Sequence, residues 1–147
     1  MGGWLLLLAL NVVATPLLAL QSFVGDARLA FESAQWAALT TPGLESYRPK
    51  LAFVLVVEML GQLWLAGHAT AVAVLFFRKS RGFPVQGIAV LVLGVALLTA
   101  DVLAVIALGV QGSTLTRVVV VVRSLVFGAV WIAYIRRSKR VAYTFVL

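Results

Sequence analysis

The stretch PVQGIAVLVLGVALLTADVLAVIALGV, residues 84–110, decides the fold of this chain. It contains a single charged side chain, Asp101, and it exceeds the roughly 20 apolar residues that a helix needs to cross the hydrocarbon core of a membrane. The stretch therefore predicts a transmembrane helix. Three more apolar stretches are long enough for the same purpose, and they lie at about 4–23, 51–77 and 115–135.

The composition excludes an ordinary soluble domain. The chain has 147 residues, of which 63% are apolar and 12% are charged, and its mean hydropathy is +1.07. A soluble domain is closer to half apolar and a quarter charged. Since four spans fill most of this length, we expect one integral membrane domain over residues 1–147. Its expected fold is an all-α, antiparallel bundle of four transmembrane helices.

Basic residues at the ends of the apolar stretches indicate the orientation. Cytoplasmic loops of membrane proteins carry the excess of Lys and Arg, so we expect both termini in the cytoplasm and the 24–50 loop outside. The distribution is typical of anchors that face anionic phospholipid, and it argues against a nucleic-acid partner despite a net charge of +7. The predicted anchors are Arg78, Lys79, Arg81, Arg136, Arg137, Lys139 and Arg140.

Two segments outside the spans are each open to two interpretations. In the outer loop, residues 31–39 are mildly amphipathic, which favours a short interfacial helical segment with Trp36 at headgroup level; a plain loop is the alternative. The C-terminal residues 136–147 form a basic cytoplasmic tail with an apolar end. This tail is expected either to lie on the inner leaflet or to dock onto a partner protein.

The sequence carries no pattern for redox, metal or catalytic chemistry. It has no cysteine, which excludes disulfides, thiolate catalysis and iron–sulfur ligation. Its single histidine, His68, argues against a protein-built zinc site. No nucleophile elbow, glycine-rich phosphate loop or paired-aspartate site is present. We therefore expect no cofactor and no enzymatic activity.

Three charged residues fall well inside the apolar stretches, where each costs roughly 2.5–3.5 kcal/mol and is usually paired or functional. Counting ~1.5 Å per residue from the outer ends places Glu58, Asp101 and Arg123 at one level, about 11–14 Å deep. Because a tight turn at 111–114 makes the third and fourth helices neighbours, we predict a salt bridge between Asp101 and Arg123. Glu58 or Gln62 is the additional partner. This polar cluster serves packing specificity, or else it carries a proton or a cation.

Two further polar residues lie nearer the cytoplasmic side. Asn11 and His68 fall at similar depths in the first two spans, which predicts an interhelical hydrogen bond worth about 1 kcal/mol. The alternative role for His68 is a proton shuttle.

Four short stretches carry a family resemblance. They are Gly3-Trp4-Leu5, Trp36-Ala37-Ala38-Leu39-Thr40, the basic turn after Phe76-Phe77, and the ending from Trp131 to Val146, of which Ser138 to Val146 is the most specific part. In these the chain resembles a bacterial four-helix membrane family, filed as domain of unknown function 2569. The resemblance covers essentially the whole chain. It implies a multi-pass protein of the bacterial inner membrane, and it brings no activity, substrate or catalytic residue.

Three functions are compatible with the sequence. The leading hypothesis is a non-catalytic accessory or assembly subunit that binds another membrane protein, because the chain is small, lacks chemical motifs and presents several small-residue helix faces. The alternative is a small oligomeric transporter or channel that couples protons or cations through Glu58, Asp101 and His68. A lipid-binding membrane protein is the third hypothesis. The expected partners are the lipid bilayer together with another membrane protein or further copies of this chain.

Overall fold

The computed structural model describes residues 3–31, 34–109 and 114–145. Those residues are helical apart from short connections, and four of the helices are long and apolar enough to cross a membrane. The prediction of an all-α chain with four helices able to span a membrane is therefore confirmed. In chain order the helices are α1 (Trp4–Phe31), α2 (Ala34–Thr40), α3 (Pro49–Phe77), α4 (Phe83–Ala107), α5 (Thr114–Arg137) and α6 (Lys139–Thr144).

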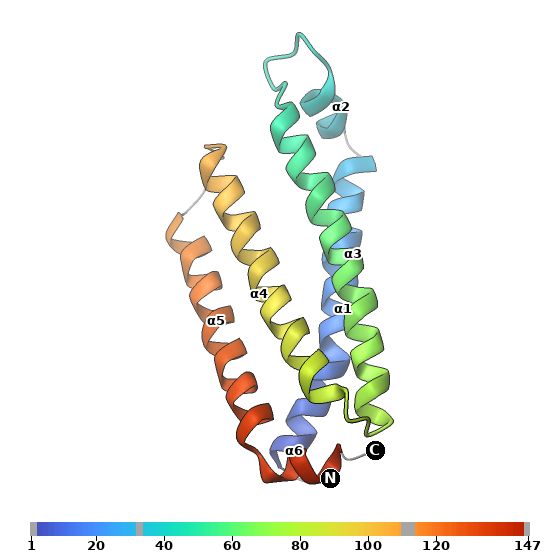
Figure 1. Cartoon of the computed structure of the whole chain (residues 1–147). Helices are drawn as coiled ribbons and strands as arrows, with labels where there is room; N and C mark the ends of the chain where they lie inside the picture. The colour runs from blue at the N-terminus through green and yellow to red at the C-terminus, as the bar shows by residue number, and fades with distance from the viewer. Residues whose placement is uncertain (1–2, 32–33, 110–113, 146–147) are drawn as a thin grey trace.

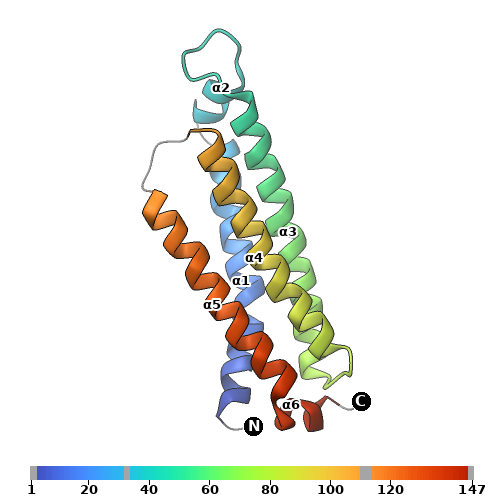
Figure 2. The ribbon, with the colours of Figure 1, turned by 60° about the vertical axis from the view of Figure 1, so that its left-hand side comes forward.

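The long helices alternate in direction, so both termini lie at one end of the molecule (Figure 1). We call this the termini end, and we call the opposite end, with α2 and the connection into α3, the loop end. Helix α1 packs along α3, α3 along α4, and α4 along α5 (Figures 1 and 2). Helix α2 contacts both α1 and α3, which confirms a helical segment within the 24–50 loop. Trp36 is half-buried there.

Helix α1 is longer than its apolar run predicts. The expected span ends at residue 23, whereas the helix continues to Phe31. The reason is a packing face that outlasts the apolar stretch, since Leu5, Val12, Ala19 and Asp26 recur every seven residues and all are buried or half-buried. Helix α4, in contrast, ends at Ala107 rather than at residue 110, and the predicted turn over 111–114 lies outside the described residues except for its last position.

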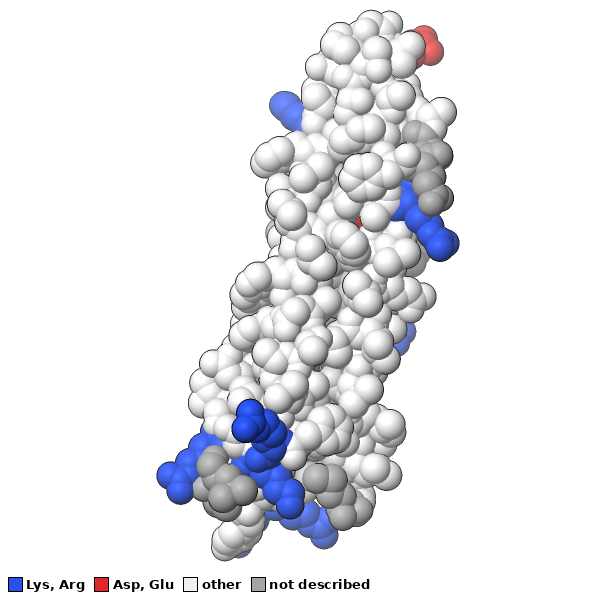
Figure 3. Space-filling model, turned by 90° about the vertical axis from the view of Figure 1, so that its right-hand side faces the viewer, with Lys and Arg blue, Asp and Glu red and all other residues white. Residues whose placement is uncertain are grey.

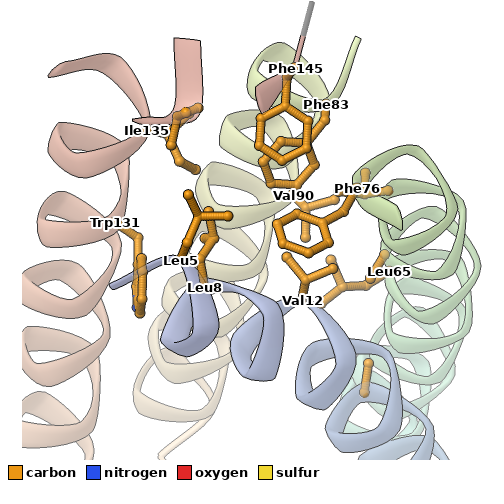
Figure 4. Close-up of a cluster of buried hydrophobic side chains, with 14 of the residues drawn as sticks. Leu5, Leu8, Val12, Leu65, Phe76, Phe83, Val90, Trp131, Ile135 and Phe145 are labelled. Carbon is orange, nitrogen blue, oxygen red and sulfur yellow. The ribbon is translucent and has the colours of Figure 1, made fainter. Parts of the chain in front are cut away.

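The best-packed part of the molecule is an aromatic cluster at the termini end (Figure 4). Phe76 from the end of α3 and Phe83 from the start of α4 are both 0% exposed, and their ring centroids are 5.0 Å apart. Phe145, which follows α6, stacks on Phe83 at 4.4 Å. We call these three residues the aromatic cap.

The apolar end of the C-terminal segment has a role that neither sequence interpretation includes. Helix α6 folds back across the termini end (Figures 1 and 2). Ser138 accepts a hydrogen bond from the Val141 N–H at the start of α6, and Val141 and Phe145 are 1% and 5% exposed. The apolar end of the chain therefore completes its own core, while Tyr143 points outward.

Helices α1 and α5 meet at the termini end through large aromatic rings. The Trp4 ring lies 6.4 Å from Trp131 and 6.0 Å from Tyr134, measured between centroids. Further toward the loop end, the close neighbour of α5 is α4. The half of α5 nearer the loop end therefore packs against α4 on one side.

The contact between α3 and α4 predicts the effect of a substitution at Gly61. A Cβ atom there would lie 3.1 Å from Leu97 Cδ2 of α4. We expect Gly61→Val to lower the free energy of unfolding by about 1–3 kcal/mol, because the two helices must move apart. Gly67→Val is the matched control, since nothing lies within 4 Å of a Cβ atom at that position of α3. Thermal unfolding in detergent micelles measures the difference, and equal losses would contradict the close packing.

Candidate functional site

Glu58, Gln62 and Asp101 come together at one cavity between α3 and α4. The cavity encloses about 190 Å³, and the rest of its wall is apolar, including Phe53 and Leu97. Glu58 lies about 13 Å along α3 from its first residue, and Asp101 lies about 9 Å before the last residue of α4, at ~1.5 Å per residue. The structure thus brings together three of the four residues of the predicted polar cluster, and Arg123 is not among them.

The two carboxyl groups interact directly. Glu58 and Asp101 are both half-buried, and their carboxyl groups lie close enough for an electrostatic interaction. Two carboxylates this close repel each other, so a proton, a cation or a basic side chain would stabilise the pair.

A third carboxyl group, which the sequence interpretation placed in the outer loop, belongs to the same region. Asp26 of α1 is half-buried and close enough to Glu58 for a direct electrostatic interaction. The signal that identifies it is its place in the seven-residue repeat that also contains Val12 and Ala19. Because this packing face continues beyond the apolar run, following it along the sequence would have placed Asp26 in the helix.

The predicted salt bridge between Asp101 and Arg123 is wrong. Within residues 3–31, 34–109 and 114–145, no ion pair joins these two side chains, and Arg123 is exposed. Its neighbours on the same face, Val120 and Phe127, are 43% and 51% exposed. The reason is rotational, because α5 turns a different face toward α4. That face consists of Val121, Ser124, Gly128, Trp131 and Ile135, all buried or half-buried.

The predicted hydrogen bond between Asn11 and His68 is also not formed in the described part of the chain. Asn11 accepts a hydrogen bond from Thr15 one turn later, with 3.2 Å between its Oδ1 and Thr15 Oγ1. His68 instead stacks on Trp64 of its own helix, with ring centroids 5.2 Å apart and planes 5° apart. Asn11 and His68 lie at similar depths, but they stand on helix faces that have different neighbours.

The seven predicted membrane anchors are all exposed. Lys and Arg side chains gather at the termini end of the molecule, as Figure 3 shows. There they can contact phosphate groups of a bilayer surface. Among the described residues, no three His, Asp or Glu side chains are placed to hold a metal ion.

Comparison with known proteins assigns the chain to a family without assigning an activity. A family model described as "Protein of unknown function (DUF2569)" matches residues 1–146. No curated protein and no solved structure matches the chain. The match extends over nearly the whole sequence, including the cavity and the aromatic cap, so the chain belongs to the DUF2569 family.

Proposed function

We propose that this protein is a non-catalytic integral membrane protein that acts by binding other membrane proteins, as an accessory or assembly subunit of a larger complex. The proposed location is the bacterial inner membrane, with the termini end in the cytoplasm. The gathering of basic side chains at that end supports this orientation, because cytoplasmic loops carry the excess of Lys and Arg.

The observation that carries the proposal is the exposure of polar side chains at membrane depth. Gln21 on α1 and Arg123 on α5 are both exposed, and neither has a hydrogen-bond or ion-pair partner among the described residues. Gln21 lines an open groove on the surface of α1 with Leu17, Val24 and Arg28. Polar side chains that face lipid are unfavourable, whereas the same side chains stabilise contacts between transmembrane helices. Partners in the membrane would supply the missing hydrogen bonds and charge.

The accessory role is tested by gentle solubilisation from native membranes followed by native mass spectrometry. We expect a second protein in fixed stoichiometry with this chain. Gln21→Leu should weaken its retention, whereas Leu18→Ala, at an exposed apolar position of α1, should retain the partner. Recovery of the chain alone, or of copies of this chain without another protein, would contradict the accessory role.

The carboxyl cavity favours a second function, which is proton coupling. The cavity shares Phe53, Val54 and Ala104 with an open groove that leads to the loop end, where Lys50 lies. Carboxyl groups at membrane depth are typical of proton pathways, so the proton is the candidate for the coupled ion. We expect this function to need an oligomer, since four spans leave little room for a pathway within one chain.

Proton coupling is tested with the purified protein in liposomes that contain a pH-sensitive dye. If the function holds, Glu58→Gln and Asp101→Asn each abolish a proton flux that the unaltered protein shows. Glu45→Gln is the matched control, because Glu45 is exposed near the loop end and outside the cavity. Absence of flux with the unaltered protein would exclude this second function.

A further inference from the structure

The charges at membrane depth are unbalanced within one copy of the chain. Three carboxyl groups, those of Asp26, Glu58 and Asp101, lie near one another between α1, α3 and α4. Arg123, a basic residue at the level of Glu58, is exposed on another face. Arg123 lies nine residues into α5, about 13 Å from its first residue, which matches the depth of Glu58 along α3.

The carboxyl pair of Glu58 and Asp101 and the side chain of Arg123 are each reachable from the membrane. The wall of the cavity includes Val57, which is 49% exposed, together with the exposed Phe53, so the carboxyl pair lies behind an opening between α3 and α4. Arg123 stands among exposed aliphatic and aromatic side chains on α5. The arginine side chain is long enough to enter such an opening with its planar guanidinium, which is shaped to bind a carboxylate.

We propose that Arg123 of one copy enters the cavity of a second copy and pairs there with Glu58 and Asp101. This inference rests on the proposed contact role and names a second copy of the chain as the occupant of the α5 face. A second copy is preferred because its carboxyl groups lie at the required depth, and one contact removes both an unpaired cation and an excess of acid. The surface on α5 differs from that on α3 and α4, so each copy can use both surfaces and form a ring.

Disulfide trapping in the purified protein tests the pairing, and the absence of native cysteines makes the background clean. Val120→Cys on α5 and Val57→Cys at the cavity opening lie about 9 Å and 12 Å from the first residues of their helices, and both positions are exposed. We expect oxidation of the chain with both cysteines to produce covalent dimers and larger products in bilayer nanodiscs and liposomes. Leu18→Cys combined with Val57→Cys is the control, and it should give no comparable product.

The role of the charges is tested in the same assay. Arg123→Gln, or Glu58→Gln with Asp101→Asn, should reduce the yield of crosslinked product about tenfold or more, while Arg123→Lys should retain part of it. Arg123→Glu combined with Glu58→Arg should restore crosslinking. Thermal unfolding of each variant identifies those that fail to fold, and the Arg123→Lys and Gln variants then decide the question.

Three outcomes would overturn the inference. The first is a chain that stays single in the membrane, and the second is crosslinking that persists unchanged in Arg123→Gln. The third is binding of Arg123 to lipid phosphate, seen as dimers that disappear when anionic lipid is added.

The inference and the accessory role fail separately. A partner protein bound to a single copy leaves the accessory role standing, whereas copies without any partner leave the self-association standing.

Discussion

Phe83→Ala is expected to lower the free energy of unfolding by about 3–5 kcal/mol, the range typical of buried Phe→Ala substitutions. Phe83 is 0% exposed and lies between Phe76 and Phe145 in the aromatic cap. Since its ring is shielded from lipid as well as from water, its removal leaves a cavity that neither solvent fills. The loss should also release α6, because Phe145 stacks on this ring.

The matched control for this prediction is Phe77→Ala. Phe77 is next to Phe76 in the sequence and is 60% exposed, so its truncation should change the free energy of unfolding by less than about 1 kcal/mol. Both variants are measured by thermal unfolding in detergent micelles, with proteolysis of the C-terminal segment as a second readout. Similar stabilities for the two variants, or an α6 segment that stays protected in Phe83→Ala, would contradict the cap.

The second large effect is expected at the carboxyl pair. Glu58→Gln and Asp101→Asn should show an interaction energy of about 1–3 kcal/mol in a double-mutant cycle, because the two side chains line one cavity and interact electrostatically. The cycle between Asp101→Asn and Arg123→Gln should be additive within about 0.5 kcal/mol in a single copy, since these residues do not touch. It is measured under dilute conditions that favour single chains.

Coupling between Asp101 and Arg123 in single chains would reinstate the salt bridge that the structure lacks. Additivity between Glu58 and Asp101 would instead disprove the direct interaction of the two carboxyl groups. The two cycles use the same Asp101 substitution, so each controls for the general effect of changing that side chain.

The four spans were predictable because membrane crossing depends on length and hydropathy, both of which can be read along the chain. Residues 84–110 are an example, since no other structure satisfies so long an apolar run. The end of α1 was not predictable on that basis. Asp26 and Arg28 end the apolar run but not the helix, whose contact with α3 continues.

The sequence was enough to predict the depth of the site residues, but only partly enough to predict which neighbouring helix each side chain faces. Counting residues brought Glu58, Asp101 and Arg123 to one level, and the structure joins the first two. The rotation of α5 could not be obtained from depth. It follows from Gly128 and Trp131 packing inward, and that choice depends on the shapes of α4 and α1.

The apolar end of the chain shows a limit of a different kind. A basic segment followed by Tyr143 and Phe145 is compatible with a bilayer surface, with a partner groove and with the chain's own core. The packing site of Phe145 forms only when the turn between α3 and α4 brings Phe76 and Phe83 together. The packing of Phe145 into the chain's own core therefore could not be predicted from the tail sequence alone.

The central claim is that this protein completes its membrane-embedded charges by contact with other chains. The most direct test is native mass spectrometry of nanodiscs cut from native membranes without detergent, comparing the unaltered chain with Arg123→Gln. We predict that the unaltered 15.7 kDa chain is found only in larger assemblies and that Arg123→Gln releases single chains. An unaltered chain that travels alone, or an assembly that Arg123→Gln leaves intact, would contradict the claim.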